Sequence, residues 1–152
     1  MFSQTAEYAL RAVVWMAMQP DQALTTQALA AGTRVPASYL AKVMQGLGRA
    51  GLVQAQRGLH GGFRLARPPA AITVLAVVNA VDPIKRIHAC PLHLPAHRHR
   101  LCPLHQRLDD AVADLEKVLA GATLADMADP AAPLWPMRET PPPAAPSTSA
   151  TA

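Results

Sequence analysis

Apolar residues near the start of the chain recur with the spacing of an amphipathic helix. From Thr5 to about Met18 they lie three or four residues apart, at Ala6, Leu10, Val13, Val14 and Ala17. A turn at 19–21 follows. The pattern predicts a first helix with one buried face.

A second and a third helix are predicted from capping residues. Thr25 or Thr26 can cap a short helix that runs to residue 31, where Gly32 can adopt the positive φ of a helix end. Pro36 suits the first position of the next helix because it needs no intrahelical N–H bond there. Two short helices separated by a tight turn are typical of a helix-turn-helix.

The third predicted helix has two chemically different faces. Its apolar face is formed by Leu40, Val43, Met44 and Leu47. At about 100° per residue, the opposite face carries Ser38, Lys42, Gln45 and Arg49. Such side chains can donate hydrogen bonds to phosphates and base edges. Any solvated surface helix can show them too, but the preceding helix and turn favour a DNA recognition helix.

A glycine-rich β-hairpin is predicted directly after this helix. Segments 52–56 and 63–66 alternate like strands, and they are joined by Arg57-Gly58-Leu59-His60-Gly61-Gly62. Glycines allow a tight turn and a close approach to another surface. We therefore expect a wing with Arg57 and His60 near a DNA groove. A nucleotide-binding loop is disfavoured because no Gly-Lys-Ser/Thr sequence follows.

The second half of the chain contains a loop and a long helix. Segment 74–81 is apolar and Val-rich, so its pattern leaves helix and strand open. A Pro/His/Cys-rich loop comes next, and a helix from Pro103 to about 120 has an apolar stripe at Leu104, Leu108, Ala111, Val112, Leu115 and Leu119. Its charged residues are expected to face solvent, namely Asp109, Asp110, Asp114 and Lys117. This helix is a natural dimerisation element, although it could also fold back on its own domain.

These elements predict a mainly α fold with a small β-hairpin wing, a winged helix-turn-helix followed by a long C-terminal dimerisation helix. The expected division is a DNA-binding domain at 1–82, a Cys/His effector loop at 83–103, and the dimerisation helix with a short terminal helix at 104–129. Residues 130–152 hold seven prolines among Ala, Ser and Thr and are expected to form a disordered tail.

Charge is distributed unevenly along the 152 residues. Residues 1–100 hold 11 Lys/Arg against three acids, and residues 101–152 hold three against seven. A basic front favours binding to a polyanion, although ordinary solvated charge would give the same count. No signal sequence and no run of about 18 apolar residues are present, so we expect a cytoplasmic protein without a membrane partner.

These motifs resemble the Rrf-type family of winged-helix transcription regulators, which includes IscR-like and NsrR-like members. The matching segments are Glu7–Arg11, Val35–Lys42, Leu47–Val53, Arg57–Ala66, Ile72–Val74, Cys90, Cys102–His105 and Thr123–Met127. The resemblance covers about residues 1–128. It implies a homodimer on a pseudo-palindromic double-stranded DNA operator, with repression the expected mode and no enzyme activity. The DNA-binding residues would be Ser38, Tyr39, Lys42, Gln45, Arg49, Arg57, Gly58, His60, Gly61 and Gly62. Ala41 replaces an acidic selectivity residue of IscR-like members, so the target sequence is expected to differ.

The resemblance also implies an effector site in the Cys/His loop. IscR-like members hold an iron–sulfur cluster with three cysteines and a histidine; here Cys90, Cys102 and His105 occupy three of these positions, but Ala96 replaces the middle cysteine. A cluster bound by one chain normally has four protein ligands. His97 could supply the fourth ligand, or Glu7 could do so from the partner subunit.

Three kinds of effector chemistry therefore stay open: a [2Fe–2S] cluster, a Zn²⁺ ion, or a cofactor-free thiol response to redox change or nitric oxide. Two functions of other classes also remain as alternatives. One is a small metal or iron–sulfur redox protein, which lacks a convincing acid/base arrangement. The other is a nucleic-acid binder without an effector.

Overall fold

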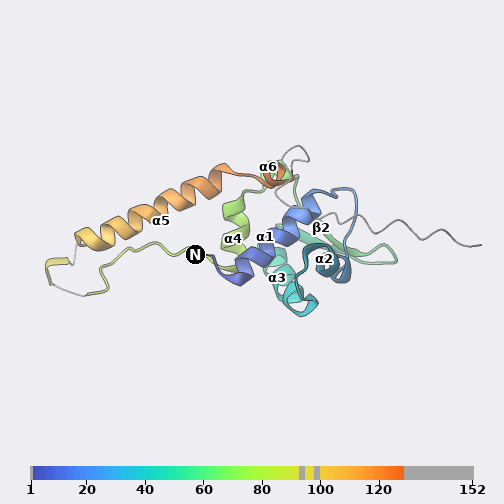
Figure 1. Ribbon diagram of the computed structural model, residues 1–152, viewed down its shortest axis with the longest axis horizontal. Helices are drawn as coiled ribbons and strands as arrows, with labels where there is room; N and C mark the ends of the chain where they lie inside the picture. The colour runs from blue at the N-terminus through green and yellow to red at the C-terminus, as the bar shows by residue number, and fades with distance from the viewer. Residues whose placement is uncertain (1, 93–94, 98–99, 129–152) are drawn as a thin grey trace, which may run out of the picture.

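One long helix projects from a body of shorter helices in the computed structural model, which describes residues 2–92, 95–97 and 100–128 (Figure 1). The helices of the body are α1 (Gln4–Ala17), α2 (Thr26–Thr33), α3 (Ala37–Arg49), α4 (Val74–Val81) and α6 (Leu124–Met127). The projecting helix is α5 (Pro103–Gly121). Strands β1 (Val53–Gln56) and β2 (Gly62–Leu65) form a hairpin, and short 3₁₀ turns lie at Pro69–Ala71 and Pro95–His97. The fold is mainly helical with a small β-hairpin, as the sequence predicts.

Side-chain caps set where the helices of the body begin. Thr25 caps α2 by accepting a hydrogen bond from the Ala28 N–H at 3.1 Å, and Thr73 caps α4 in the same way. The prediction that Gly32 ends α2 is wrong. The helix continues to Thr33, and Arg34 takes the left-handed conformation with φ 55°. A Cβ on Gly32 would lie 2.4 Å from the Trp15 ring, so close packing against α1 explains this glycine.

The core of the body lies between α1 and α3. It contains the predicted apolar face of α3, because Leu40, Val43, Met44 and Leu47 are all buried. They pack with residues of the neighbouring elements, namely Ala9, Ala12, Val13, Met16, Leu29, Ile72, Val77 and Leu124. The third helix begins one residue later than expected, with Pro36 as its N-cap. Burial of the apolar face fixes this side of α3 against the body, so the opposite side faces outward.

The hairpin is attached to the body through an isolated β-bridge between Leu24 and Phe63. β1 and β2 pair antiparallel, with Val53 opposite Leu65 and Gln56 opposite Gly62. Leu24 adds to the edge of β2, because its N–H donates to the Phe63 carbonyl at 2.9 Å and its carbonyl accepts from the Phe63 N–H at 2.8 Å. The wing is therefore joined to the segment between α1 and α2.

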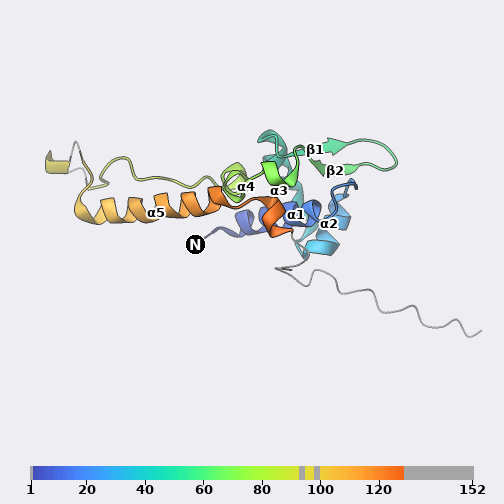
Figure 2. The same cartoon turned by 90° about the horizontal axis from the view of Figure 1, so that it is seen from above.

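The structure shows which elements the second half of the chain forms and how they are connected. Segment 74–81, which the pattern left open, is helical. Its start is tied to the end of α5, because the Val74 N–H donates to the Ala122 carbonyl and the Leu124 N–H donates to the Ile72 carbonyl, both at 2.9 Å. From α4 the chain runs outward beside α5 and returns through that helix, so both views show an arm on the side of the body opposite the wing (Figures 1 and 2).

The expected solvent exposure of Asp109 is wrong, because this residue is only 6% exposed. Among the described residues, no helix has the length and apolar character needed to span a membrane. The tail predicted at 130–152 lies outside the described residues. The division of the chain into domains stays a prediction.

Candidate nucleic-acid interface and metal site

The polar face of α3 is open to solvent. Ser38, Lys42, Gln45 and Arg49 are all exposed on the side of the helix opposite the buried stripe. Tyr39 is 50% exposed, and its ring meets the Tyr8 ring edge to face with centroids 5.6 Å apart. This contact with α1 holds the start of α3. The result is an outward helix face with hydroxyl, amide and cationic donors and no acidic side chain.

The wing presents a second exposed surface. Arg57 and His60 are exposed as predicted, and Gly58 takes φ 110° in the turn. Gly61 lies close to the turn backbone, since a Cβ there would be 2.6 Å from the Gln56 carbonyl oxygen. Leu59 is 96% exposed at the tip, which the sequence analysis did not single out. Leu59 lies between Gly58 and His60, so the tip of the wing exposes an apolar side chain next to a polar one.

The two cysteines and two of the histidines come together at the outer end of the arm. His105 Nδ1 lies 3.1 Å from Cys102 Sγ and 3.6 Å from Cys90 Sγ. His97 Nδ1 lies 3.3 Å from Cys90 Sγ. Both cysteines are free and buried. The ligand atoms of Cys90, Cys102 and His105 all lie within 4.8 Å of one another, so these three residues form a group that could hold a metal ion.

The start of α5 gives this group an unusual thiol. Cys102 is the N-cap of the helix, with Pro103 following as the first helical residue. Hydrogen bonding from the His105 backbone and then from its side chain lowers the pKa of Cys102 to about 7. The thiolate is the form that binds metals and attacks oxidants. At neutral pH a large part of Cys102 is therefore ready for either chemistry.

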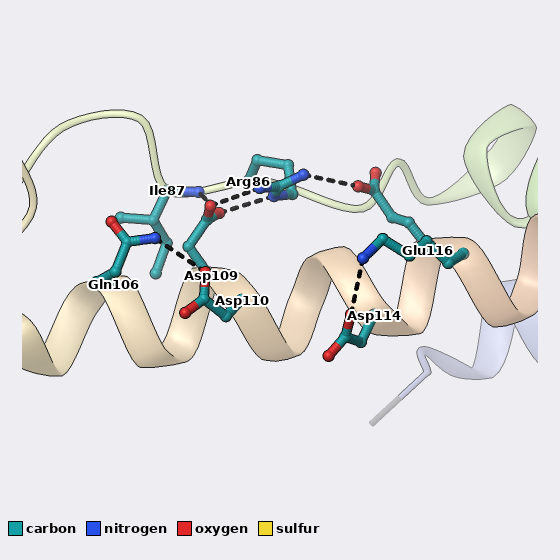
Figure 3. A network of polar contacts seen from close by, with 8 residues as sticks. Arg86, Ile87, Gln106, Asp109, Asp110, Asp114 and Glu116 are labelled. Carbon is teal, nitrogen blue, oxygen red and sulfur yellow. Dashed lines mark hydrogen bonds and ion pairs between the residues drawn. The ribbon is translucent and has the colours of Figure 1, made fainter.

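An ion-pair clasp holds the Cys90 segment against α5 (Figure 3). Arg86 donates from Nε to Asp109 Oδ1 at 2.8 Å and from Nη2 to Oδ2 at 2.5 Å, and it contacts Glu116 at 3.3 Å. The Ile87 N–H also donates to Asp109 Oδ1 at 2.8 Å. The Arg86 guanidinium is the main reason that the pKa of Asp109 falls to about 2. The clasp lies four residues before Cys90 and four after His105.

The remaining candidate ligands are placed differently. Glu7 lies on α1, where it is exposed and forms an ion pair with Arg11. Of the other histidines in the 83–103 loop, His88 is exposed, and His93 and His99 lie outside the described residues. The sequence analysis missed the pairing of Arg86 with Asp109. The sequence does place a carboxylate that could pair with an arginine one turn after His105. It does not show which of several acids pairs with Arg86.

Comparison with known proteins gives a consistent picture. The sequence matches the Rrf2 family, described as iron-dependent transcriptional regulators, over residues 2–130. An HTH-type transcriptional regulator from Aquifex aeolicus (strain VF5) is 27% identical over 129 residues, which cover 83% of this chain and 90% of that protein.

Solved structures share the fold. CymR (YrzC), the global cysteine regulator of B. subtilis, is similar with a TM-score of 0.71 and 23% identity over 84% of this chain and 95% of that chain. IscR of T. potens gives a TM-score of 0.69 and 23% identity over 84% of this chain and 85% of that chain. The family and the Aquifex relative are transcriptional regulators rather than enzymes. The chain is therefore a winged-helix transcriptional regulator that belongs to the Rrf2 family.

Proposed function

We propose that this regulator acts in the cytoplasm as a homodimer on a pseudo-palindromic operator, with repression as its mode, and that it receives its signal at Cys90, Cys102 and His105. One observation carries the DNA-binding part: the outward face of α3 holds Ser38, Lys42, Gln45 and Arg49 and no acidic side chain, while its other face is buried in the body. A helix held in this way can enter a major groove without disturbing the core.

The two exposed surfaces have complementary tasks in this proposal. Ser38, Tyr39, Lys42, Gln45 and Arg49 contact phosphates and base edges in the major groove. The wing contacts the neighbouring groove through Arg57 and His60, and Gly58, Gly61 and Gly62 allow its backbone to come close to the sugar-phosphate chain. Arginine at a groove edge contributes through both charge and hydrogen bonding.

The exposed apolar stripe on α5 supports a homodimer. Leu104, Leu108, Leu115 and Val118 lie along one side of the helix and are 64%, 48%, 39% and 69% exposed. Leu119, by contrast, packs against Ala6, Val74 and Val78 of its own body. A long helix with an uncovered apolar side is stabilised when a second copy covers it. Two-fold symmetry then places two α3 helices for two operator half-sites.

The position of the Cys/His group indicates how a signal reaches DNA. The group lies at the outer end of the arm, away from α3 and the wing of its own chain (Figures 1 and 2). In a dimer built along α5, a change there acts on the pairing of the arms or on the partner's body. An effector shifts DNA affinity only as far as it binds the DNA-competent and incompetent arrangements differently.

A second form of signalling is favoured by one observation. The pKa of Cys102 is lowered to about 7, mainly by hydrogen bonding from the His105 backbone, and Cys90 is its buried neighbour. A thiolate beside a second thiol can be oxidised reversibly. A thiol response without a cofactor is therefore the second candidate mechanism for the same regulator.

DNA selection followed by binding measurements tests the proposal. Duplexes enriched from a random pool by the full chain serve as probes in fluorescence anisotropy at several salt concentrations. We expect affinity to fall steeply with salt, and Lys42→Ala to reduce the logarithmic salt slope by about 1 if it loses one phosphate contact. Lys117→Ala, which removes the same charge from α5, is the matched control. Failure to enrich any duplex, or equal effects of the two variants, would contradict the proposed DNA interface.

Arg57→Ala tests the wing separately. We expect it to weaken operator binding by about 1–3 kcal/mol and to leave the dimer intact, because the wing lies away from α5. Arg107→Ala on α5 is the control with the same side-chain change. Unchanged affinity of Arg57→Ala would remove the wing from the interface.

A further inference from the structure

We propose that the group at the outer end of the arm holds a single tetrahedral metal ion of the zinc type rather than an iron–sulfur cluster, with the ligands Cys90, His97, Cys102 and His105. This inference rests on the proposed function only in treating the group as the regulator's effector site. The metal site itself follows from the donor atoms of one chain.

The spacing of the donor atoms fits one ion. Zn–S bonds of about 2.3 Å and Zn–N bonds of about 2.0–2.1 Å in a tetrahedron place neighbouring ligand atoms roughly 3.3–3.8 Å apart. The three measured sulfur–nitrogen distances are 3.1, 3.3 and 3.6 Å. His105 Nδ1, on α5, is close to both sulfurs. His97 Nδ1 approaches Cys90 from the 3₁₀ turn at Pro95–His97. The ligand atoms of Cys90, Cys102 and His105 already lie close enough together for one ion. His97 Nδ1 contacts Cys90 alone, so it has to move toward Cys102 and His105 to complete the tetrahedron.

The same spacing does not fit a two-iron cluster. Any three protein ligands of such a cluster include two that are bound to different irons, and those two stand farther apart than ligands of one ion. Yet Cys90, Cys102 and His105 keep all their ligand atoms within 4.8 Å of one another, with His105 Nδ1 close to both sulfurs. A Cys₂His₂ set can also hold a two-iron cluster of the Rieske type, but there both histidines bind one iron and both cysteines bind the other. That arrangement separates the histidines from the cysteines, whereas His105 Nδ1 lies 3.1 and 3.6 Å from the two sulfurs here.

The chemistry of the donors selects the kind of ion. Two thiolates and two imidazoles form a tetrahedral S₂N₂ set, which suits Zn²⁺ and excludes hard ions such as Mg²⁺ or Ca²⁺. Cys90 and Cys102 are buried, so water does not compete freely for their sulfurs. Cys90 and Cys102 bind the ion as thiolates, so any protons still on their sulfurs pass to solvent, and no oxidation or reduction takes place.

The Arg86–Asp109 clasp holds the segment that leads to Cys90 against α5. It fixes Arg86 and Ile87 to α5 one turn after His105, and Cys90 follows three residues after Ile87. The Cys90 segment therefore meets the start of α5 before any ion is present. A bound ion adds a second tie between the same two segments, which makes the outer end of the arm more rigid.

Metal titration of the full chain, purified without oxygen, tests this assignment. Co²⁺ is the first probe, because a tetrahedral ion with two thiolates gives strong visible bands and thiolate charge-transfer absorption. We expect one Co²⁺ per chain, displaced by one Zn²⁺. Replacing a ligand, as in Cys90→Ser, Cys102→Ser, His97→Ala or His105→Ala, should reduce Zn²⁺ affinity at least about tenfold. His88→Ala changes an exposed histidine of the same segment and should leave the affinity unchanged.

Several results would overturn the inference. They are equal amounts of iron and acid-labile sulfide with no mononuclear site, no binding of Co²⁺ or Zn²⁺, an octahedral Co²⁺ spectrum, or an equal loss of affinity in His88→Ala. Operator binding is measured on the same samples. DNA binding without metal binding would refute the metal site alone, whereas metal binding without DNA binding would refute the proposed function and leave the site in place.

Discussion

Replacing Gly62 with alanine is expected to loosen the wing from the body. Gly62 begins β2 with φ 149°, a conformation that side-chain-bearing residues rarely adopt. An added Cβ would lie 2.6 Å from the carbonyl carbon and oxygen of Leu24 and 3.0 Å from its nitrogen. These are backbone atoms of the segment to which β2 is joined. They can retreat only by moving the wing or the segment.

The expected cost follows from these contacts. The clash disturbs the two hydrogen bonds between Leu24 and Phe63, each of which contributes about 1 kcal/mol. Holding alanine at a positive φ adds about 1–3 kcal/mol. We expect Gly62→Ala to lower the free energy of unfolding by about 3–5 kcal/mol, a large share of the roughly 5–15 kcal/mol available to a small domain.

Gly58→Ala is a matched control within the same hairpin. Gly58 also has a positive φ, 110°, but a Cβ there would meet nothing within 4 Å. It should therefore show only the conformational part of the cost. Urea unfolding followed by circular dichroism measures the stability of both variants. Fluorescence anisotropy compares operator binding of Gly62→Ala with that of the parent protein under conditions where both are folded. We expect Gly62→Ala to bind about tenfold more weakly if displacing the wing loses roughly 1.4 kcal/mol of contact energy.

Comparison of the two variants tests whether the contact between Gly62 and Leu24 holds the wing in place. If Gly62→Ala destabilises the protein no more than Gly58→Ala, the contact with Leu24 does not hold the wing in place. If Gly62→Ala is less stable but binds DNA as the parent does, the position of the wing has no part in binding.

Two further predictions concern the arm. The pKa of Asp109 is lowered to about 2, first by the Arg86 hydrogen bonds. The stability that this carboxylate contributes is therefore present above its ordinary pKa of about 4 and is lost as pH falls from about 4 through about 2. Asp109→Asn should flatten this part of a urea-unfolding pH series, whereas Asp110→Asn should not. Val118→Glu should convert the proposed dimer to monomer in analytical ultracentrifugation, because it places a charge on the apolar stripe of α5. Ala120→Glu adds the same charge at an exposed position on the other side of the helix, and equal dissociation by both would contradict pairing along the stripe.

Local pattern was enough to predict the elements that bind DNA in the proposal. The stripe from Leu40 to Leu47 and the opposite polar face of α3 follow from helical periodicity alone, because burial of one side of a helix leaves a repeat of 3.6 residues in the sequence. The hairpin was readable for a similar reason, since alternation and a glycine-rich turn are short-range signals. Gly32 was misread because its role depends on Trp15 of another helix, which no local pattern records.

The sequence by itself therefore determined the order of the elements, the two faces of α3, the wing and the residue types available to an effector site. Only the tertiary structure decided that 74–81 is helical and that Asp109 is buried against Arg86, 23 residues away. The same structure shows that His105 reaches both thiols while His97 reaches Cys90. It also decided which apolar residues of α5 stay uncovered, since Leu119 packs inward while Val118 does not. These outcomes depend on contacts between distant segments, where several partners of equal chemistry compete and packing of the whole chain selects one.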